Sequence, residues 1–409
     1  MVVSRVAMVS MHTSPVSAPG TADAGGMNVS VMGVAEELAA RGTEVDLLTR
    51  AVGTPSSRLV LPGVRLHELA AGGGGTIAKH DLPRVSDEFG EAVAALARRP
   101  DAGYDIIHAH YWLSGIASLP AALEMQIPFV QSFHTLAAMK NAASIPDAPP
   151  EPVIRERSEA FLAAQASAFI ASSSAEASAA IDLAGAPAER TWIIPPGVDL
   201  ALFSPRQDIE HERVRAALGL EPDRPLIVIA GRVQPLKGHD LAVRVLAEIA
   251  VMRGWAPVLV IAGEVTPGDA PFVAALRELA GELGVEPDVR FVGALNRETL
   301  ADLLSAASVT LVPSYSETFG LVALESAACG TPVVAYRAGG LTESVEEGRS
   351  GIVLGTRDPR YWATEVAIIL EDEERRERYA ITGREHAQRF TWAAAATSLL
   401  GVYSGAGRP

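Results

Sequence analysis

Short apolar runs alternate with longer amphipathic stretches along the whole chain. Several runs, among them Leu226–Ala230 and Val258–Ala262, are apolar at every position, as strands covered on both faces of a sheet are. This alternation predicts an α/β fold built on parallel sheets. The predicted strands are Arg5–Ser10, Val45–Thr49, Ile106–His110, Phe129–Phe133, Phe169–Ser172, Thr191–Ile194, Leu226–Ala230, Val258–Ala262, Val289–Val292, Val309–Val312, Pro332–Tyr336 and Gly351–Leu354.

A segment rich in proline, Pro195–Asp199, divides this pattern into two halves of similar length. A chain of 409 residues is also too long for one ordinary core. We therefore predict two doubly wound, Rossmann-like domains, residues 1–200 and 201–389, whose parallel sheets face each other across a central cleft. The Gly72–Gly75 run and the Pro-rich Ile145–Pro152 segment are expected to be mobile loops.

Composition and charge narrow the class of protein. Hydrophobic residues make up 48% of the chain, yet no run of about eighteen apolar residues occurs, so no membrane span is expected. The N-terminal segment is too short and strand-like for a signal peptide, and the single Cys329 cannot form an internal disulfide. A reducing, cytoplasmic location is therefore expected. The net charge of −15 argues against nucleic acid and anionic membranes as partners.

Two carboxylates, Glu317 and Glu325, flank a glycine turn that leads into an apolar, helix-like run. If this helix begins near Phe319, the N–H groups of its first turn are unpaired and converge on one point, where a phosphate can bind. Carboxylates on either side of a diphosphate could then hold the hydroxyls of a sugar and a ribose. The competing interpretation of this segment is a solvated acidic helix on the surface.

A glycine-containing loop follows the first strand of each half. In the first half, Gly25 and Gly26 open a helix, where they let a ligand approach the backbone closely; a plain tight turn is the alternative. In the second half, Arg232 and Lys237 follow a buried strand at the predicted cleft; the alternative is a pair of solvated surface cations. A guanidinium fork and a compact ammonium together could neutralise a diphosphate without a metal ion.

Three histidines, His108, His110 and His134, stand at the ends of neighbouring predicted strands. A lone histidine is more often structural than catalytic. Three at strand ends could also bind a metal, but no cysteine or acidic partner accompanies them at zinc spacing, so no metal site is predicted. His134 is the better functional candidate, as a hydrogen-bonding group at the reacting centre. No Gly-x-Ser-x-Gly turn or other nucleophile motif is evident.

In combination, these motifs resemble the retaining glycosyltransferases of family 4, which have the two-domain GT-B fold. The paired glutamates, the Gly231–Gly238 loop, Val198-Asp199 and Ala338-Gly339-Gly340 match that family in order along nearly the whole chain. Within the family, the likeness is to the branch that glycosylates an inositol phosphate at the start of mycothiol synthesis. The segments that carry this likeness are Met11–Pro15, Gly25–Asn28, His110–Gly115 and His134–Ala138.

The resemblance implies a retaining transfer of N-acetylglucosamine from UDP-N-acetylglucosamine to 1D-myo-inositol 3-phosphate. It implies that Glu317 holds hydroxyls of the donor sugar, that Glu325 holds the ribose, and that Arg232 and Lys237 bind the diphosphate. His134, Glu317, Arg232 and Lys237 are thus the expected catalytic residues. The expected donor-binding residues are Gly26, Arg232, Lys237, Glu317, Phe319, Gly320, Leu321, Val322 and Glu325.

For the acceptor, the resemblance implies a pocket formed by His12 and the loop from Asp23 to Asn28. The positions that match the family's acceptor-phosphate site are Lys79, Tyr111, Thr135 and Arg155. No cofactor is expected to be required. The family has a peripheral Mg²⁺ site, but Leu304, Ser305 and Ser308 replace its Tyr, Arg and Asp, and Ser30 replaces a Tyr after the glycine pair.

The C-terminal segment Phe390–Ala393, leading into Leu399 and Tyr403, resembles the family's final helix. By that likeness, residues from about 390 to 409 are expected to cross back onto the first domain, and a homodimer is compatible with the resemblance. Two other functions stay open. One is a family 4 enzyme with a different sugar-phosphate or lipid-linked acceptor, and the other is a nucleotide-sugar-binding protein without turnover.

Overall fold

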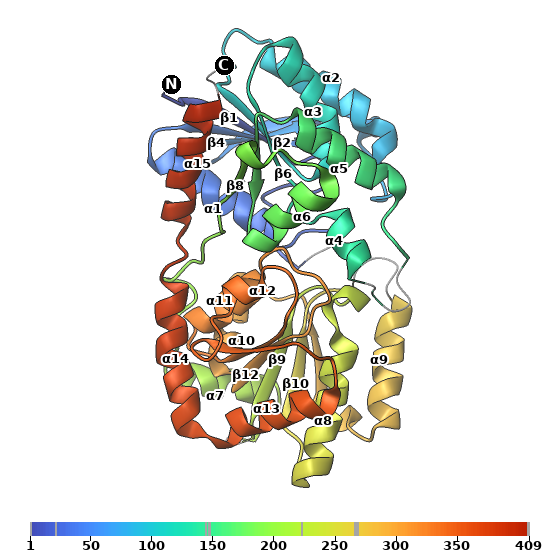
Figure 1. The fold of residues 1–409 in the computed structure, drawn as a ribbon, viewed down its shortest axis with the longest axis vertical. Coiled ribbons are helices and arrows are strands. Elements are labelled where there is room, and N and C mark those ends of the chain that lie inside the picture. The colour runs from blue at the N-terminus through green and yellow to red at the C-terminus, as the bar shows by residue number, and fades with distance from the viewer. Residues whose placement is uncertain are drawn as a thin grey trace.

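The computed structural model describes residues 2–20, 23–143, 145, 149–221, 224–265 and 270–406. These residues form two α/β domains stacked along the long axis of the molecule (Figure 1). Each domain has a central sheet with apolar cores on both of its faces. The predicted doubly wound architecture is therefore confirmed.

The sheet of the first domain consists of β1 (Arg5–Val9), β2 (Glu44–Arg50), β3 (Ser56–Leu61), β4 (Val64–Leu69), β5 (Ile106–His110), β6 (Phe129–Ser132), β7 (Ala168–Ala171) and β8 (Thr191–Ile193). Over the described residues its order is β3-β4-β2-β1-β5-β6-β7-β8, and the pairings are parallel except for β3 with β4. The sequence does not predict the β3–β4 hairpin, because the residues of β3 are mostly exposed and follow no apolar pattern.

The first domain's helices are α1 (Gly26–Ala40), α2 (Ser86–Ala97), α3 (Trp112–Glu124), α4 (Ala137–Ala142), α5 (Val153–Gln165), α6 (Ser174–Ala184) and α15 (Trp392–Ala406), with 3₁₀ turns η1 (Gly72–Gly74), η2 (Leu82–Val85) and η3 (Ala188–Arg190). Phe89 of α2 and Leu162 of α5 belong to the core on one face of the sheet. Leu38 of α1 and Leu399 of α15 belong to the core on the other face. The last helix of the described chain is thus part of the first domain.

The sheet of the second domain consists of β9 (Leu226–Ala230), β10 (Val258–Ala262), β11 (Val289–Gly293), β12 (Val309–Val312), β13 (Val333–Tyr336) and β14 (Gly351–Leu354). Over the described residues its order is β11-β10-β9-β12-β13-β14 with parallel pairings, which is the order of a classical Rossmann sheet. Strand order reverses between β9 and β12, as it does between β1 and β5 in the first sheet. Ligands of doubly wound sheets bind at such switch points.

The second domain's helices are α7 (Asp208–Ala217), α8 (His239–Arg253), α9 (Ala270–Glu282), α10 (Arg297–Ala306), α11 (Leu321–Ala328), α12 (Leu341–Ser344), α13 (Pro359–Glu371) and α14 (Glu373–Ala387), with 3₁₀ turns η4 (Pro235–Lys237) and η5 (Glu286–Asp288). Leu246 of α8 and Trp362 of α13 pack on one face of the sheet. Leu304 of α10 and Leu324 of α11 pack on the other.

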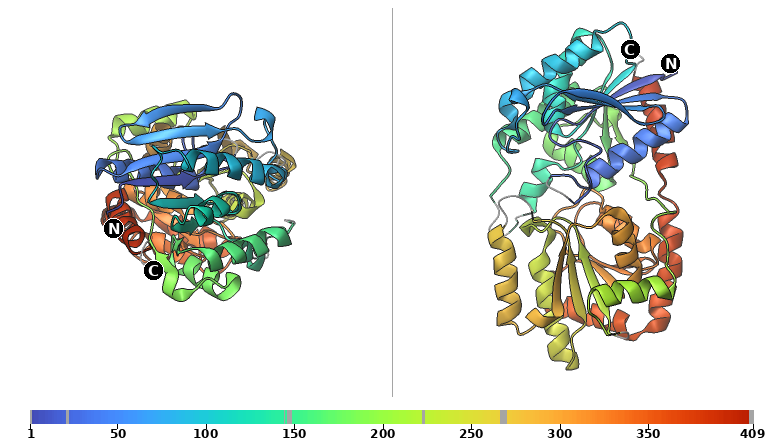
Figure 2. Two further views of the ribbon diagram at one scale, coloured as in Figure 1. Left: turned by 90° about the horizontal axis from the view of Figure 1, so that it is seen from above. Right: turned by 180° about the vertical axis from the view of Figure 1, so that it is seen from behind.

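Two passages of the chain join the domains at one side of the molecule (Figure 2). They meet where the N–H of Val198 donates to the carbonyl of Phe390 at 3.0 Å. A Cβ added to Gly197 would lie 2.2 Å from the backbone nitrogen of Trp392, so the close approach requires glycine. Beyond this crossing, the Tyr403 hydroxyl of α15 lies 2.7 Å from His108 Nδ1 of β5.

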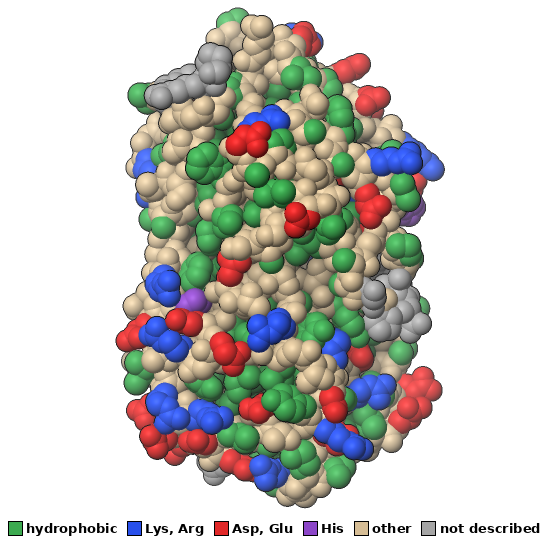
Figure 3. Space-filling model, viewed as in Figure 1, with side chains coloured by type: hydrophobic (Ala, Val, Ile, Leu, Met, Phe, Trp, Pro, Cys, Tyr) green, Lys and Arg blue, Asp and Glu red, His purple; other side chains and the backbone are tan. Residues whose placement is uncertain are grey.

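The surface carries both signs of charge. Figure 3 shows basic and acidic side chains intermixed over the second domain, although the sequence has a net charge of −15. Among the described helices, none is both long enough and apolar enough to cross a bilayer.

Candidate active site

A cavity of about 300 Å³ lies between the two domains, at the carboxyl ends of their central strands. The first domain contributes loops after β1, β5 and β6 and the beginning of α1, and the second contributes loops after β9, β10, β11 and β12 and the beginning of α11. The polar and glycine residues of its lining include His12, Asp23, Gly26, Lys79, Tyr111, His134, Thr135, Lys140, Arg232, Lys237, Arg297, Ser314, Glu317, Gly320 and Glu325.

Two helix N-termini meet across this cavity. A Cβ added to Gly26, the first residue of α1, would lie 3.4 Å from Leu321 Cδ1, the first residue of α11. Gly320 caps α11 with a φ of 97°, and a Cβ there would lie 2.5 Å from Leu341 Cδ2. Both the left-handed backbone and the packing therefore require glycine at this turn. The unpaired N–H groups of such turns favour an anion between them.

Helix α11 begins at Leu321, two residues later than the expected start near Phe319. The Phe319 ring is buried and packs edge-on against Phe390 with ring centroids 5.5 Å apart. Phe319, Gly320, Leu321 and Val322 all line the cavity. The turn before α11 therefore lies at the cavity, and the Phe319 side chain anchors it in the core.

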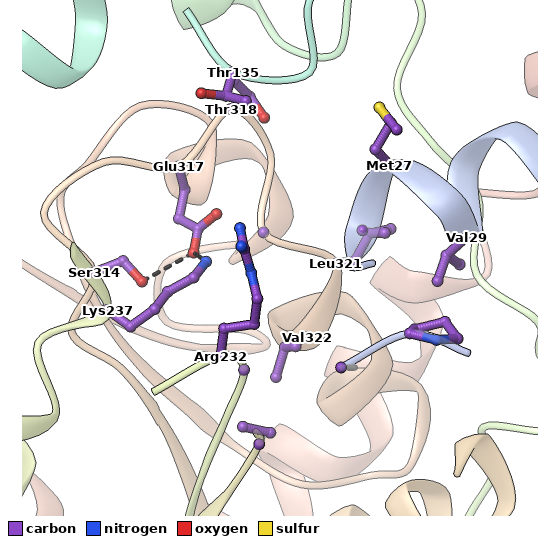
Figure 4. Close-up of a pocket in the computed structure, with 18 of the residues that line it drawn as sticks. Met27, Val29, Thr135, Arg232, Lys237, Ser314, Glu317, Thr318, Leu321 and Val322 are labelled. Carbon is purple, nitrogen blue, oxygen red and sulfur yellow. Dashed lines mark hydrogen bonds and ion pairs between the residues drawn. The ribbon is translucent and has the colours of Figure 1, made fainter. Parts of the chain in front are cut away.

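The loops after β9 and β12 bring opposite charges together. Lys237 Nζ lies 2.5 Å from Glu317 Oε1, which also accepts a hydrogen bond from the Ser314 hydroxyl at 2.9 Å. Figure 4 shows these three side chains side by side, with the Arg232 side chain extending into the same space. Glu317, Lys237 and Arg232 are thus gathered around one point of the second domain's wall.

Glu325 is buried in α11, and its Oε1 lies 2.5 Å from Arg297 Nη1. Arg297 opens α10, and its guanidinium also lies over the Phe203 ring at 4.5 Å. The sequence interpretation missed Arg297. The signal that could have identified it is its position just after β11, where the carboxyl end of another central strand meets the cavity.

Asp23 connects the two domains. Its Oδ1 lies 3.2 Å from Lys79 Nζ in the first domain and 3.4 Å from Arg232 Nη1 in the second. One carboxylate therefore sits between a cation expected to bind the acceptor and a cation expected to bind the donor. Asp23 thus links the first-domain half of the site to the second-domain half.

Tyr111 is the centre of the first-domain half. Its ring centroid lies 5.2 Å from Lys79 Nζ, 5.0 Å from Arg155 Cζ and 4.3 Å from the His12 ring centroid. The residue has a φ of 75°, a backbone strain that a packed functional site can hold. Arg155 Nη2 donates to the Thr135 carbonyl at 2.7 Å, so all four predicted phosphate residues lie together.

Two predicted acceptor residues are nevertheless not part of the cavity wall over the described residues. Asn28 is buried, and its side chain accepts from Gly25 N at 3.0 Å and donates to the Ser14 carbonyl at 2.7 Å. Arg155 lies behind Tyr111, where its guanidinium is already hydrogen-bonded to protein groups. Both residues hold their loops in place from outside the cavity.

The histidines form a buried network. His110 Nδ1 lies 2.9 Å from His134 Nε2, and the His134 carbonyl accepts from the Thr318 hydroxyl of the other domain at 3.0 Å. Burial lowers the pKa of His134 to about 4 and that of His108 to about 3, so both imidazoles are neutral at pH 7. His134 can therefore donate or accept a hydrogen bond, but it carries no charge to the site.

The residues present do not fit a metal ion. Among the described residues, no cluster of three or more His, Cys, Asp or Glu side chains could hold one. At the peripheral positions, Leu304 is core, the Ser305 hydroxyl accepts from Arg206 N at 2.8 Å, and the Ser308 hydroxyl accepts from Leu226 N at 3.2 Å.

This arrangement can hold two anionic ligands next to each other. The second-domain wall offers Arg232, Lys237 and the beginning of α11, and the first-domain wall offers Lys79 and Tyr111. Carboxylates at positions 317 and 325 can accept hydrogen bonds from ligand hydroxyls. The His134 imidazole lies beside both walls. Such a site suits group transfer between two phosphorylated molecules.

Residues 210–386 match the family described as Glycosyl transferases group 1, and residues 25–197 match the Glycosyl transferase 4-like domain. The chain therefore belongs to the group 1 family of glycosyltransferases and is an enzyme of that class. The two matches correspond to the two domains, and together they agree with the GT-B fold.

Comparison with similar proteins supports the same family assignment. The D-inositol 3-phosphate glycosyltransferases of Stackebrandtia nassauensis and Jonesia denitrificans are 41% and 42% identical to this chain, over 98% of it and 91% and 95% of their own lengths. Among solved structures, sucrose-phosphate synthase from Thermosynechococcus elongatus has a TM-score of 0.88 and 31% identity over 98% of both chains. Anabaena HepE in complex with UDP and glucose shares the fold, with a TM-score of 0.80, 22% identity and coverage of 98% of this chain and 99% of its own.

Proposed function

We propose that this enzyme transfers N-acetylglucosamine from UDP-N-acetylglucosamine to 1D-myo-inositol 3-phosphate, with retention of configuration at the anomeric carbon. The relatives named D-inositol 3-phosphate glycosyltransferase support the choice of acceptor. The structural observation that carries the proposal is the convergence of Lys79, Tyr111 and Thr135 on the cavity wall opposite Arg232 and Lys237. Two cationic walls suit two phosphorylated substrates.

In this proposal the donor lies against the second domain. Arg232 and Lys237 bind the diphosphate, which also faces the N–H groups at the beginning of α11. Glu317 then exchanges its contact with Lys237 for hydroxyls of the donor sugar. Glu325, held by Arg297, accepts hydrogen bonds from the ribose.

The acceptor lies against the first domain. Lys79, Tyr111 and Thr135 surround its phosphate, and Arg155 holds Thr135 and packs on Tyr111 from behind. His12 and Asp23 face the inositol ring. Because Asp23 also contacts Arg232, the acceptor hydroxyl is brought close to the donor's diphosphate.

The reaction breaks the bond between the anomeric carbon and the β-phosphate oxygen and forms a bond from that carbon to an inositol oxygen on the same face. The proton of the inositol hydroxyl passes to the departing phosphate oxygen, so no side-chain base is required. The protein contributes orientation and stabilisation of the charge that develops on the diphosphate. His134 hydrogen-bonds the reacting sugar as a neutral imidazole.

Product analysis tests this proposal. The purified enzyme is incubated with UDP-N-acetylglucosamine and either a panel of inositol phosphates, a panel of hexose phosphates or free inositol. We expect transfer to 1D-myo-inositol 3-phosphate far above transfer to free inositol, with an α-linked product by NMR. Equal turnover of free inositol, or an inverted product, would contradict the proposal.

A second candidate is transfer to a different sugar phosphate. The 31% identity to a sucrose-phosphate synthase favours it, and the same acceptor panel distinguishes it. Binding of UDP-N-acetylglucosamine with no UDP release on any acceptor would instead indicate a nucleotide-sugar-binding protein. A homodimer and a cytoplasmic location stay predictions from the sequence.

A further inference from the structure

The distribution of lysine in this chain is unusual. The 409-residue sequence contains three lysines against thirty-one arginines, and all three lysines line the cavity between the domains. Over the described residues, the ion pairs outside the cavity are formed by arginine, as in Arg98 with Glu124, or by histidine, as in His67 with Asp46. A lysine ammonium is a compact charge on a flexible stem, whereas a guanidinium is a rigid planar fork. The chain therefore has an ammonium only where the ligands would lie.

Two of these lysines already have a role in the proposed function, but Lys140 does not. It lies in α4, just after the Thr135 loop, and its side chain is 24% exposed. Its Nζ is 2.8 Å from Glu151 Oε1. An ammonium has three N–H donors, so this contact leaves capacity for a ligand oxygen.

Arg155, the cation expected at the acceptor phosphate, is already occupied by protein groups. Its Nε donates to Glu159 at 2.7 Å, its Nη1 lies 2.8 Å from Glu151 Oε2, and its Nη2 donates to the Thr135 carbonyl at 2.7 Å. Its side chain is 3% exposed, and over the described residues the cavity wall contains Lys140 instead. Lys140 is thus better placed than Arg155 to reach a ligand.

Glu151 joins these two cations. One carboxylate oxygen contacts Lys140 and the other contacts Arg155, as two oxygens of a phosphate would. Burial lowers the pKa of both Lys140 and Lys79, with repulsion from Arg155 acting in the same direction. Asp23 and Glu151 offset part of this effect, and an anion in the cavity would act in the same direction as these carboxylates.

We infer that Lys140 binds the anionic group of the acceptor directly, and that this group competes with the Glu151 carboxylate for it. The inference rests on the proposed function in that it assumes an anionic acceptor in the first-domain half of the cavity. It does not depend on which phosphorylated acceptor the enzyme uses. Arg155 then acts as a positioning residue that holds Thr135, Tyr111 and Glu151.

Steady-state kinetics on the full chain test this inference. Lys140→Met should raise the acceptor KM by about 10- to 100-fold and leave the donor KM within about 2-fold, because it removes one charged hydrogen bond to the acceptor. Lys140→Arg keeps the charge and should have a smaller effect. Glu151→Gln removes the competing charge at constant shape and should lower the acceptor KM by about 3- to 10-fold.

The matched controls are Arg98→Met and Glu124→Gln, which break an exposed ion pair of the same domain outside the cavity. Neither should change the acceptor KM. Melting curves of each variant establish that it is folded, and Lys140→Gln, which also removes the charge, serves if Lys140→Met is not. A rise in acceptor KM with Glu151→Gln would contradict the proposed competition between Glu151 and the acceptor for Lys140, because Glu151 would then support acceptor binding.

A second measurement separates this inference from the identity of the acceptor. Inorganic phosphate, added to enzyme saturated with UDP, should raise the melting temperature of the wild type and of Arg98→Met, and much less that of Lys140→Met. If inositol phosphates are not substrates but this difference is seen, the proposed function fails and the inference stands. If Lys140→Met retains both the acceptor KM and the phosphate effect, Lys140 is not a ligand.

Discussion

At the scale of single residues, the charged groups of the cavity are held in pairs that span different loops. Lys237 is paired with Glu317, Arg297 with Glu325, and Asp23 with both Lys79 and Arg232. These contacts fix the charges before a substrate arrives, which reduces the reorganisation needed during the reaction. Substrate anions and hydroxyls then exchange partners with groups that are already in place.

The first prediction concerns the cations at the donor diphosphate. Arg232→Gln or Lys237→Met should each lower kcat by about 10²- to 10³-fold, by analogy with the loss of one oxyanion donor, because charge on the leaving diphosphate loses a partner. Release of UDP measures the effect. Arg253→Gln, at an ion pair with Glu371 in the same domain, is the control. A loss confined to the acceptor KM would contradict this assignment.

The second prediction concerns pH. Burial lowers the pKa of His108 to about 3 in the folded protein, whereas an unfolded histidine has a pKa of about 6.5. Between these values the unfolded chain binds the proton and the folded chain does not, so acid destabilises the fold by up to about 1.4 kcal/mol per pH unit for this group. Stability is therefore retained above pH 6.5 and lost as the pH falls.

Melting temperatures at pH 7 and pH 5 test this expectation. The wild type should lose stability toward pH 5, and His108→Gln should lose less over the same interval because it has no imidazole to protonate. His80→Gln, at a side chain that is 82% exposed, should match the wild type. An identical pH dependence in His108→Gln would show that His108 does not contribute.

The residues predicted to bind the donor, among them Arg232, Glu317 and Glu325, all line the cavity, and the signal for them is a set of contiguous motifs that follow buried strands. The other half of the site depends on side-chain direction, which spacing does not encode. Arg155 points behind Tyr111, while Lys140, within a segment that offers no strand or glycine signal, points into the cavity. The sequence therefore identifies the loops of this half of the cavity better than the individual side chains that line it.

At the scale of elements, all twelve predicted strands agree with the structure to within one residue at each end. Several were predictable because burial on both faces makes a strand a continuous apolar run, as in β9, whereas the predicted strand β8 is largely exposed. The exposed strand β3 carries no such signal. The sequence predicted the beginning of α11 two residues too early. Phe319 looked like the first apolar position of the helix, but it lies before the helix and packs against Phe390 in the core.

The third prediction concerns the turn before α11. Gly320→Ala places a Cβ in a left-handed backbone and against Leu341, which should cost about 1–3 kcal/mol and displace the N–H groups that face the donor. We expect a lower melting temperature and a higher donor KM. Gly281→Ala, in α9 with no neighbour within 4 Å of the new Cβ, should be neutral or stabilising. Unchanged donor binding in Gly320→Ala would contradict the role of this turn.

At the scale of the whole molecule, a few polar contacts across the cleft hold the domains together. Thr318 donates to the His134 carbonyl, Asp23 lies near Arg232, and Glu343 of α12 accepts from Ser174 N at the beginning of α6 at 2.7 Å. Each contact involves groups at or beside the cavity. These contacts therefore link the relative position of the two domains to the site between them.

The fourth prediction follows from Glu343, which lies outside the cavity wall over the described residues. Glu343→Ala removes a carboxylate from the beginning of α6 and should raise both substrate KM values by about 2- to 10-fold through weaker closure. Small-angle scattering with substrates present should show a larger radius of gyration than for the wild type. The control is Glu385→Ala, at an exposed pair with Arg349. An effect on one substrate alone would argue against a closure effect.

The return of α15 to the first domain has a consequence for biosynthesis. This helix leaves the ribosome after every residue of the second domain, yet its Leu399 and Tyr403 complete the core beneath Leu38 and β5. The second domain can finish folding during translation, whereas the first lacks part of its core, beside α1, until α15 is made. The first domain is therefore made first but completes its core last.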